Sequence, residues 1–221
     1  MRTILAAVVL ALLPQEKNEA EELFKKMEAK LAAAKSVQFK FEGEMNPRGV
    51  KLSGTLVFGE TNQSRCDLEG KFGEESQSIS VISDGKMARM TTSEPPENKA
   101  FAVPETLGRL MRLAAARAGC LGTIDVSQRE EKAKEDPEKA FAASDFKLGA
   151  KEKVGEREAQ AVEYKLVRKG EKDSAATVWI DAETHLPLKR TLKMGTKTLE
   201  ENYSGWKLDE KIDAAKFELP E

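Results

Sequence analysis

Few residues in this chain are of a type and spacing that could do chemistry. The only histidine, His185, lies in a predicted turn before Leu186 and Pro187. It has no second histidine and no nearby cysteine with which to form a metal site. Asp181 and Glu183 fall in the same predicted turn, where acidic residues are usually just solvated. We therefore predict that the protein holds no metal and no cofactor.

The short motifs that carry catalysis are also missing. The chain has no nucleophile elbow, no glycine-rich phosphate loop and no Cys-x-x-Cys pair. Its 38 acidic residues are spread along the whole length, and no two of them stand out as a hydrolytic pair. We therefore predict that the protein is not an enzyme and has no catalytic residues.

The sequence contains two cysteines, Cys66 and Cys120, and leaves their state open. Cys66 falls in a predicted strand, and Cys120 follows a predicted helix. In an exported protein the two could form a disulfide, whose loop would contribute about 4 kcal/mol in the chain-entropy model. Two separately buried thiols are the alternative, because a sequence does not give the distance between them.

The apolar residues are organised around residues 36–59, which predict two antiparallel strands. Val37, Phe39 and Phe41 alternate with polar residues, and the alternation resumes after a Pro/Gly turn at residues 46–49. A period of two over long runs is typical of strands with one apolar and one solvated face. Something must therefore cover the apolar face.

Further elements follow in both halves of the chain. Apolar residues at helical spacing predict helices over residues 18–34 and 105–118. Between them, three prolines in residues 94–104 predict a break in the sheet. Alternation predicts more strands over residues 62–70, 75–83, 86–92, 143–153, 159–168, 175–181, 185–194 and 196–203.

The N-terminus predicts export. One arginine precedes an apolar run over residues 4–13, which is too short to span a bilayer and has the length of a signal-peptide core. A buried N-terminal helix is the alternative. We predict a signal peptide over residues 1–15, and a single domain over residues 16–221 with a helical insert near residues 104–142. No cysteine follows the apolar run to accept a lipid anchor, so we predict a periplasmic or otherwise exported protein.

The predicted helix over residues 105–118 either closes an ordinary core or acts as a lid over a concave sheet, with Gly119 and Gly122 as a hinge. In the second case the space beneath it is a pocket for an apolar ligand. The residues predicted to line it are Phe39, Phe41, Met45, Leu52, Leu56, Phe58, Ile79, Val81, Met87, Leu107, Leu110 and Met111.

Several segments together resemble the LolA-like outer-membrane lipoprotein-sorting (carrier) superfamily, over about residues 17–220. They are the opening AEELFKKMEAKLAAAKSVQFKFEGEM, the hairpin VISDGKMARM, the stretch VWIDAETHLPLKRTLKM and the closing ENYSGWKLDEKIDAAKFELP. The resemblance implies an open, unclosed β-barrel whose mouth is plugged by helices. It also implies a hydrophobic cavity that shelters lipid or lipoprotein acyl chains in the periplasm.

With the resemblance, we predict an α+β fold built on a strongly curved antiparallel sheet, an incomplete β-barrel of about ten to eleven strands. The N-terminal helix and the helical insert would cover its concave face. The expected function is a non-enzymatic, monomeric carrier for acyl chains, with an envelope membrane protein as a further partner. The alternative is an envelope sensor or protein-interaction domain without lipid. A net charge of −2 gives no general attraction to nucleic acid, which we do not expect as a partner.

Overall fold

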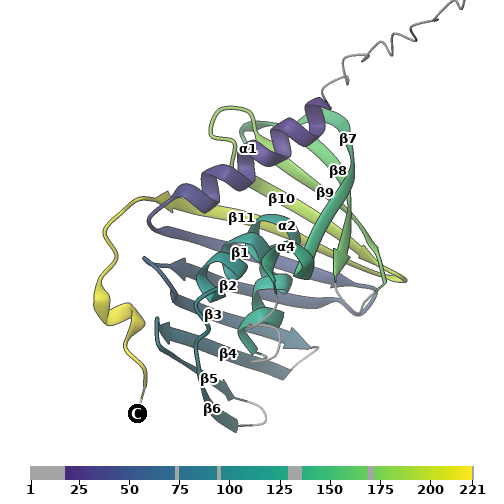
Figure 1. The fold of residues 1–221 in the computed structure, drawn as a ribbon. Helices are drawn as coiled ribbons and strands as arrows, with labels where there is room; N and C mark the ends of the chain where they lie inside the picture. The colour runs from purple at the N-terminus through teal and green to yellow at the C-terminus, as the bar shows by residue number, and fades with distance from the viewer. Residues whose placement is uncertain (1–17, 73–74, 94–95, 129–135, 169–171, 221) are drawn as a thin grey trace, which may run out of the picture.

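The computed structural model describes residues 18–72, 75–93, 96–128, 136–168 and 172–220 (Figure 1). The predicted signal peptide lies outside them. The first described element is helix α1 (Glu19–Ala33). The side chain of Asn18 accepts hydrogen bonds from the amides of Ala20 and Glu21, which satisfies donors that a helix start otherwise leaves unpaired. Acidic residues in the first turn favour the same start through the helix dipole.

One antiparallel sheet of eleven strands makes up most of the fold. The strands are β1 (Val37–Asn46), β2 (Val50–Phe58), β3 (Gln63–Phe72), β4 (Glu75–Asp84), β5 (Met87–Ser93), β6 (Pro96–Ala102), β7 (Phe141–Val154), β8 (Arg157–Arg168), β9 (Ser174–Asp181), β10 (Pro187–Met194) and β11 (Lys197–Leu208).

The two halves of the chain join at the centre of this sheet. The strand order is β6-β5-β4-β3-β2-β1-β11-β10-β9-β8-β7, so β1 pairs with β2 on one side and with β11 on the other. Strands β6 and β7 are the outer edges and do not pair with each other within the described residues. The sheet curves round α1 and α2 without closing (Figure 1). The predicted open, curved antiparallel sheet with helices on one face is confirmed.

The structure corrects the prediction for residues 94–104. The sheet does not break there, because β6 pairs with β5 from Ser93 opposite Pro96 to Met87 opposite Ala102. Pro96 is tolerated because it is the first residue of an edge strand, where a missing amide hydrogen costs no ladder bond. The following helix is also longer than predicted: α2 (Leu107–Gln128) continues past a kink at Gly119. A short helix, α4 (Pro137–Ala140), leads into β7.

The core lies between the apolar face of the sheet and the two helices. Phe24, Met27 and Leu31 of α1 are buried in it, as are Leu110 and Met111 of α2. A smaller apolar contact lies on the opposite face, where Val57 and Ile82 are buried and the 3-10 helix η1 (Ala214–Phe217) packs on β3 and β4. Within the described residues, no helix is both long and apolar enough to cross a membrane.

Candidate functional site

The structure gathers most of the predicted pocket residues beneath α2, where side chains enclose them. Those with buried side chains in one core cluster are Phe39, Phe41, Leu56, Phe58, Val81, Leu107, Leu110 and Met111. Met45, Leu52 and Ile79 are partly buried and pack against this cluster. In this closed arrangement, an apolar ligand would reach these residues only if α2 moved away from the sheet.

Met87 does not join the others, because its side chain is 39% exposed. It is the first residue of β5, in which Ala88 and Met90 are the buried positions. Since successive side chains of a strand point to opposite faces, Met87 lies on the other face from Ala88. Met90 lies against the core instead.

A buried polar cluster fixes the kink of α2 to the sheet. Arg190 of β10 donates hydrogen bonds to the carbonyl oxygens of Ala115 (3.1 Å) and Ala116 (2.5 Å), just before the kink. Glu201, its cross-strand partner on β11, accepts a hydrogen bond from the amide of Cys120 (3.2 Å), just after the kink. The kink ends one helical segment and starts another. The cation of Arg190 bonds carbonyls that the first segment leaves unpaired, and the anion of Glu201 bonds an amide at the start of the second.

The sequence contained a signal for this cluster that the prediction did not use. Arg190 falls between Leu188 and Leu192 in the alternation of its strand, and Glu201 falls between Leu199 and Tyr203. Charged residues at apolar positions of a strand are expected to be buried and paired. Arg190 is 1% exposed and Glu201 is 2% exposed.

The two cysteines are both buried free thiols in this structure. Burial raises the pKa of Cys66 to about 12, and the neighbouring carboxylate of Asp67 adds to the effect. Burial also raises the pKa of Cys120 well above its ordinary value, helped by Glu201 and by Cys66. Protonated, enclosed thiols of this kind are poor nucleophiles, so the geometry favours a packing role over covalent chemistry.

Two arginines of α2 connect it to α1. Arg112 donates hydrogen bonds to the carbonyl oxygens of Leu31 (3.2 Å), Ala34 (2.7 Å), Lys35 (3.1 Å) and Gly59 (2.8 Å). It therefore binds the C-terminal end of α1 and the end of β2 together. Nothing in the local sequence marks Arg112, because its partners are main-chain atoms distant along the chain.

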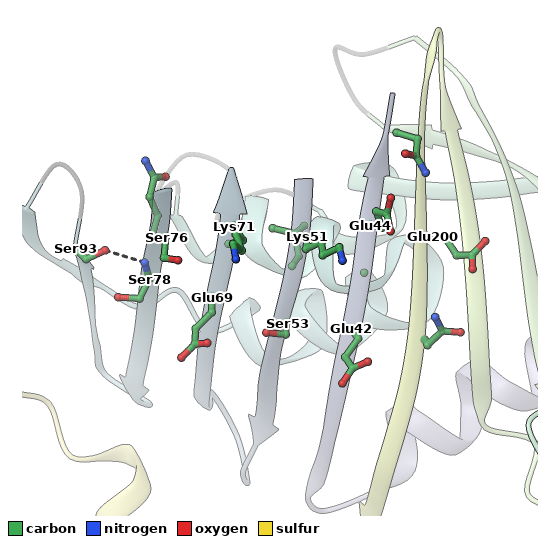
Figure 2. Close-up of a pocket in the computed structure, with 16 residues that line it drawn as sticks. Glu42, Glu44, Lys51, Ser53, Glu69, Lys71, Ser76, Ser78, Ser93 and Glu200 are labelled. Carbon is green, nitrogen blue, oxygen red and sulfur yellow. Dashed lines mark hydrogen bonds between the residues drawn. The ribbon is translucent and has the colours of Figure 1, made fainter. Parts of the chain in front are cut away.

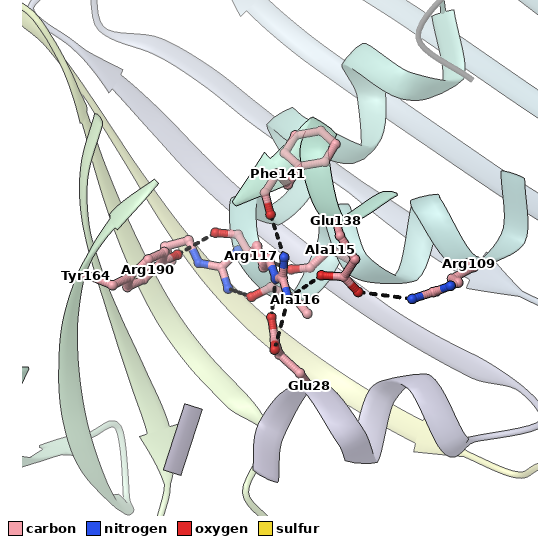
Figure 3. Close-up of polar contacts among 9 residues, drawn as sticks. All are labelled: Glu28, Arg109, Ala115, Ala116, Arg117, Glu138, Phe141, Tyr164 and Arg190. Carbon is pink, nitrogen blue, oxygen red and sulfur yellow. Dashed lines mark hydrogen bonds and ion pairs between the residues drawn. The ribbon is translucent and has the colours of Figure 1, made fainter. Parts of the chain in front are cut away.

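Arg117 makes the second connection (Figure 3). Its guanidinium forms an ion pair with Glu28 of α1, a second with Glu138 of α4 at 3.0 Å, and a hydrogen bond to the carbonyl oxygen of Phe141 at 2.7 Å. Burial would lower the pKa of Arg117, but the hydrogen bond and charge of Glu28 and the charge of Glu138 raise it above its ordinary value. The side chain is thus a stable cation at the meeting point of three helices.

A groove of about 750 Å³ runs between α1 and α2. Ala29 and Ala32 of α1 and Leu113 and Ala116 of α2 line it with small or apolar side chains. Ala116 also belongs to the core cluster, so this part of the groove floor is the outer surface of the core. Charged residues also line the groove: Lys25, Glu28, Lys35, Glu60, Arg109, Arg112, Arg117 and Glu138.

A larger, polar trough of about 1000 Å³ lies on the face of the sheet that the helices do not cover (Figure 2). Cross-strand register places Lys71 next to Lys51, and Lys51 next to Glu44. Glu42, Glu69 and several serines line it as well, and Figure 2 shows these side chains on one side of the strands. More of the exposed surface of the trough is polar than apolar, and the polar part includes charged and hydroxyl groups.

The turn that contains Asp181 and His185 is held together by the contacts of the Asp181 side chain. Asp181 is buried and accepts hydrogen bonds from the amides of Thr184 (2.6 Å) and Glu183 (3.1 Å). It also pairs with Arg157 at 2.6 Å. Burial raises the pKa of Asp181, but the hydrogen bonds from Thr184 and Glu183 and the charge of Arg157 outweigh it and lower the pKa overall. Among the described residues, no three His, Cys, Asp or Glu side chains are grouped so as to hold a metal ion.

Comparison with solved structures finds similar folds at low sequence identity. LprF from Mycobacterium bovis is 9% identical, covers 85% of this chain and 92% of its own, and superposes with a TM-score of 0.52. A LolA superfamily protein from Nitrosomonas europaea is 11% identical, over 90% of this chain and 97% of its own, with a TM-score of 0.36. The chain shares the fold of LprF, and at this identity the likeness concerns the fold alone. The open, unclosed sheet that the predicted resemblance implied is confirmed as a fold.

A third similar structure is the MucA/MucB complex of Pseudomonas aeruginosa. The matching chain of that complex is 13% identical over 91% of this chain, with a TM-score of 0.47. The match covers 61% of that chain's own length. No family model matches the sequence. No curated protein matches it either.

Proposed function

We propose that the protein is an exported, non-enzymatic carrier or binding protein that shelters lipid or lipoprotein acyl chains. The observation that supports this is one continuous apolar surface shared by the inner face of an unclosed sheet and α2. Movement of α2 would convert this surface into a trough lined by Phe39, Phe41, Leu56 and Met111. We propose that the ligand binds in this apolar trough beneath α2. We also propose that the protein is a periplasmic monomer.

The energetics are compatible with such a movement. Burial of an acyl chain gains about 0.8 kcal/mol per methylene, so a dozen methylenes gain about 10 kcal/mol before the costs of association. Displacing α2 alone would break the hydrogen bonds of Arg190 and Glu201 to its main chain and those of Arg112 to α1 and to the end of β2. Hydrogen bonds to charged groups contribute roughly 1.5–3 kcal/mol each, so the gain offsets their loss where water or the ligand takes over several of the freed donors and acceptors.

Energy transfer from tryptophan to cis-parinaric acid tests the proposal. Trp206 stacks on Phe39 with ring centroids 4.2 Å apart, next to the proposed trough. Trp179 lies under the ammonium group of Lys189 and serves as a control. We expect saturable binding at about one probe per protein, with energy transfer that falls more in W206F than in W179F.

Extraction of the protein purified from envelope should also release bound lipid, detected by mass spectrometry. Absence of both probe binding and bound lipid would contradict the proposal. A probe signal that W206F leaves unchanged would place the ligand elsewhere.

A protein-interaction function without lipid is the second candidate, and the polar trough favours it. Lys51 and Lys71 are cross-strand neighbours of like charge, and Glu42, Glu44 and Glu69 line the same trough. Charges of both signs on one open face can pair with complementary charges of a partner protein. A photo-crosslinker placed at Ser53 should then capture one envelope protein, and K51E/K71E should abolish capture without changing parinarate binding.

A further inference from the structure

We propose that the groove between α1 and α2 binds a single-chain lipid with an anionic head group. This inference rests on the proposed function and adds an outer site, separate from the trough beneath α2, together with the charge of the head group that this site prefers. The groove lies outside the core, in contrast to the enclosed trough beneath α2. It is therefore accessible to a ligand in the arrangement that the structure shows.

The floor of the groove suits an acyl chain. Ala29 and Ala32 are exposed on α1, on the side away from the buried Phe24, Met27 and Leu31. Across the groove, Leu113 is half-buried and Ala116 is fully buried. Small side chains leave room between the helices, and the volume of about 750 Å³ falls in the usual range of ligand sites.

The charges around the groove favour an anion. The acids Glu28 and Glu138 are already neutralised, Glu28 by Arg117 and Glu138 by Arg109 at 3.0 Å and by Arg117. Arg112 is hydrogen-bonded to main-chain carbonyls and forms no ion pair within the described residues. Burial lowers the pKa of Arg112, and the nearby charge of Asp209 raises it in part. Five basic residues (Lys25, Lys35, Arg109, Arg112 and Arg117) and three acids (Glu28, Glu60 and Glu138) line the groove, so its lining is positive on a chain whose net charge is −2.

Two side chains can supply donors to the head group. The ammonium group of Lys35 forms no hydrogen bond or ion pair within the described part of the chain, and Lys35 lines the groove. Arg109 is 70% exposed, and its pair with Glu138 is of the surface kind that contributes about 0–1 kcal/mol. An anionic head group can therefore take the place of Glu138 at little cost. Arg112 adds charge, but its Nη hydrogens are occupied.

The test compares four ligands with the same twelve-carbon chain and different heads: dodecanoate, dodecyl phosphate, dodecyl maltoside and dodecyltrimethylammonium. Their affinities are measured by calorimetry below the micelle concentrations. We expect the two anionic ligands to bind about tenfold more tightly than the maltoside, and the cationic ligand to bind most weakly. Tenfold corresponds to about 1.4 kcal/mol.

Matched variants locate the site. K35Q/R109Q should remove the preference for anionic heads and leave the maltoside affinity unchanged. The control K26Q/R48Q makes the same charge change at exposed positions outside the groove and should change nothing. A32W should fill the groove and abolish the binding event that prefers anionic heads. A33W, at the next exposed residue of α1, does not line the groove and should bind like the parent. Circular dichroism and urea unfolding check that each variant folds.

The outcomes separate this inference from the proposed function. If parinarate still transfers energy from Trp206 but A32W and K35Q/R109Q bind all ligands normally, the groove is not the site, and the carrier function stands. If no acyl ligand binds at all, both are wrong. If sedimentation shows a dimer that A32W dissociates, the groove holds a second copy of the chain, which overturns the inference.

Discussion

Gly119 has φ 69° and ψ −156°, a backbone conformation that residues with a side chain hardly ever adopt. A Cβ atom at this position would lie 2.0 Å from Oε2 of Glu201 and 2.6 Å from the hydroxyl of Tyr203. We predict that Gly119→Ala lowers the free energy of unfolding by about 2–4 kcal/mol, because backbone strain and the displaced polar cluster add. Urea unfolding measures the change.

Gly49 is the matched control for this substitution. Its φ is also positive, 62°, but a Cβ atom there would have no neighbour within 4 Å. Gly49→Ala should therefore lower stability by only about 1 kcal/mol. If the two variants lost the same stability, the contacts of the kink with Glu201 and Tyr203 would be shown not to matter.

A second prediction at the residue scale concerns alkaline pH. Burial raises the pKa of Cys66 from 9.0 to about 12, so the folded protein keeps this proton where the unfolded chain loses it. The stability linked to Cys66 is therefore complete below pH 9 and is lost as the pH rises from 9 towards 12. The pKa values of Tyr164 and Tyr203 are raised by burial as well and act in the same direction.

Urea midpoints measured between pH 7.5 and pH 10.5 should thus fall above about pH 9. Cys66→Ala should make this fall shallower. The folded protein should also react with a thiol reagent at pH 8 only through unfolding, so urea should accelerate the reaction strongly. Rapid labelling of either cysteine without denaturant would contradict the enclosed position of the two thiols.

At the scale of elements, Arg112 holds the C-terminal end of α1 and the end of β2 against α2. Arg112→Gln should lower the free energy of unfolding by about 2–3 kcal/mol, because several carbonyls, three of them in part-buried hydrogen bonds, lose a charged donor. Hydrogen exchange should speed up first in the last turn of α1. Arg109→Gln is the control, since its exposed ion pair should cost less than about 1 kcal/mol. Equal exchange rates in the two variants would refute this role of Arg112.

The kink of α2 shows how two strands position a helix. Arg190 and Glu201 are cross-strand partners, so β10 and β11 present opposite charges at one place on an apolar face. The carbonyls of Ala115 and Ala116 bond Arg190, and the amide of Cys120 bonds Glu201. This arrangement sets where α2 lies along the sheet, and therefore which apolar residues it covers.

At the scale of the whole molecule, the pairing of β1 with β11 joins strands from the two ends of the chain. The halves of the sheet share this centre and one core cluster, so we predict that they unfold together. Circular dichroism and tryptophan fluorescence should give the same urea midpoint. Trp179 and Trp206 both report on the second half of the sheet, on β9 and β11. A fluorescence transition separate from the dichroism transition would show two independent units.

Particular residues show how far the sequence allowed prediction. The alternation of Phe39 and Phe41 with polar neighbours correctly gave the apolar face of β1, because side-chain direction in a strand depends only on local geometry. The same rule was misapplied at Met87, which lies out of phase with Ala88 and Met90. Pro96 suggested a break in the sheet, although an edge strand accepts a proline at its first position.

The sequence by itself determined the local elements: an amphipathic helix over residues 18–34, long alternating strands with one apolar face, and polar turns between them. These follow from periodicity and backbone preference, which act between neighbours in the chain. Only the tertiary structure decided that β1 pairs with β11, that Arg190 bonds α2, and that a charged groove lies between α1 and α2. Such contacts join residues far apart in the chain, and their geometry exists only once the sheet has curved around the helices.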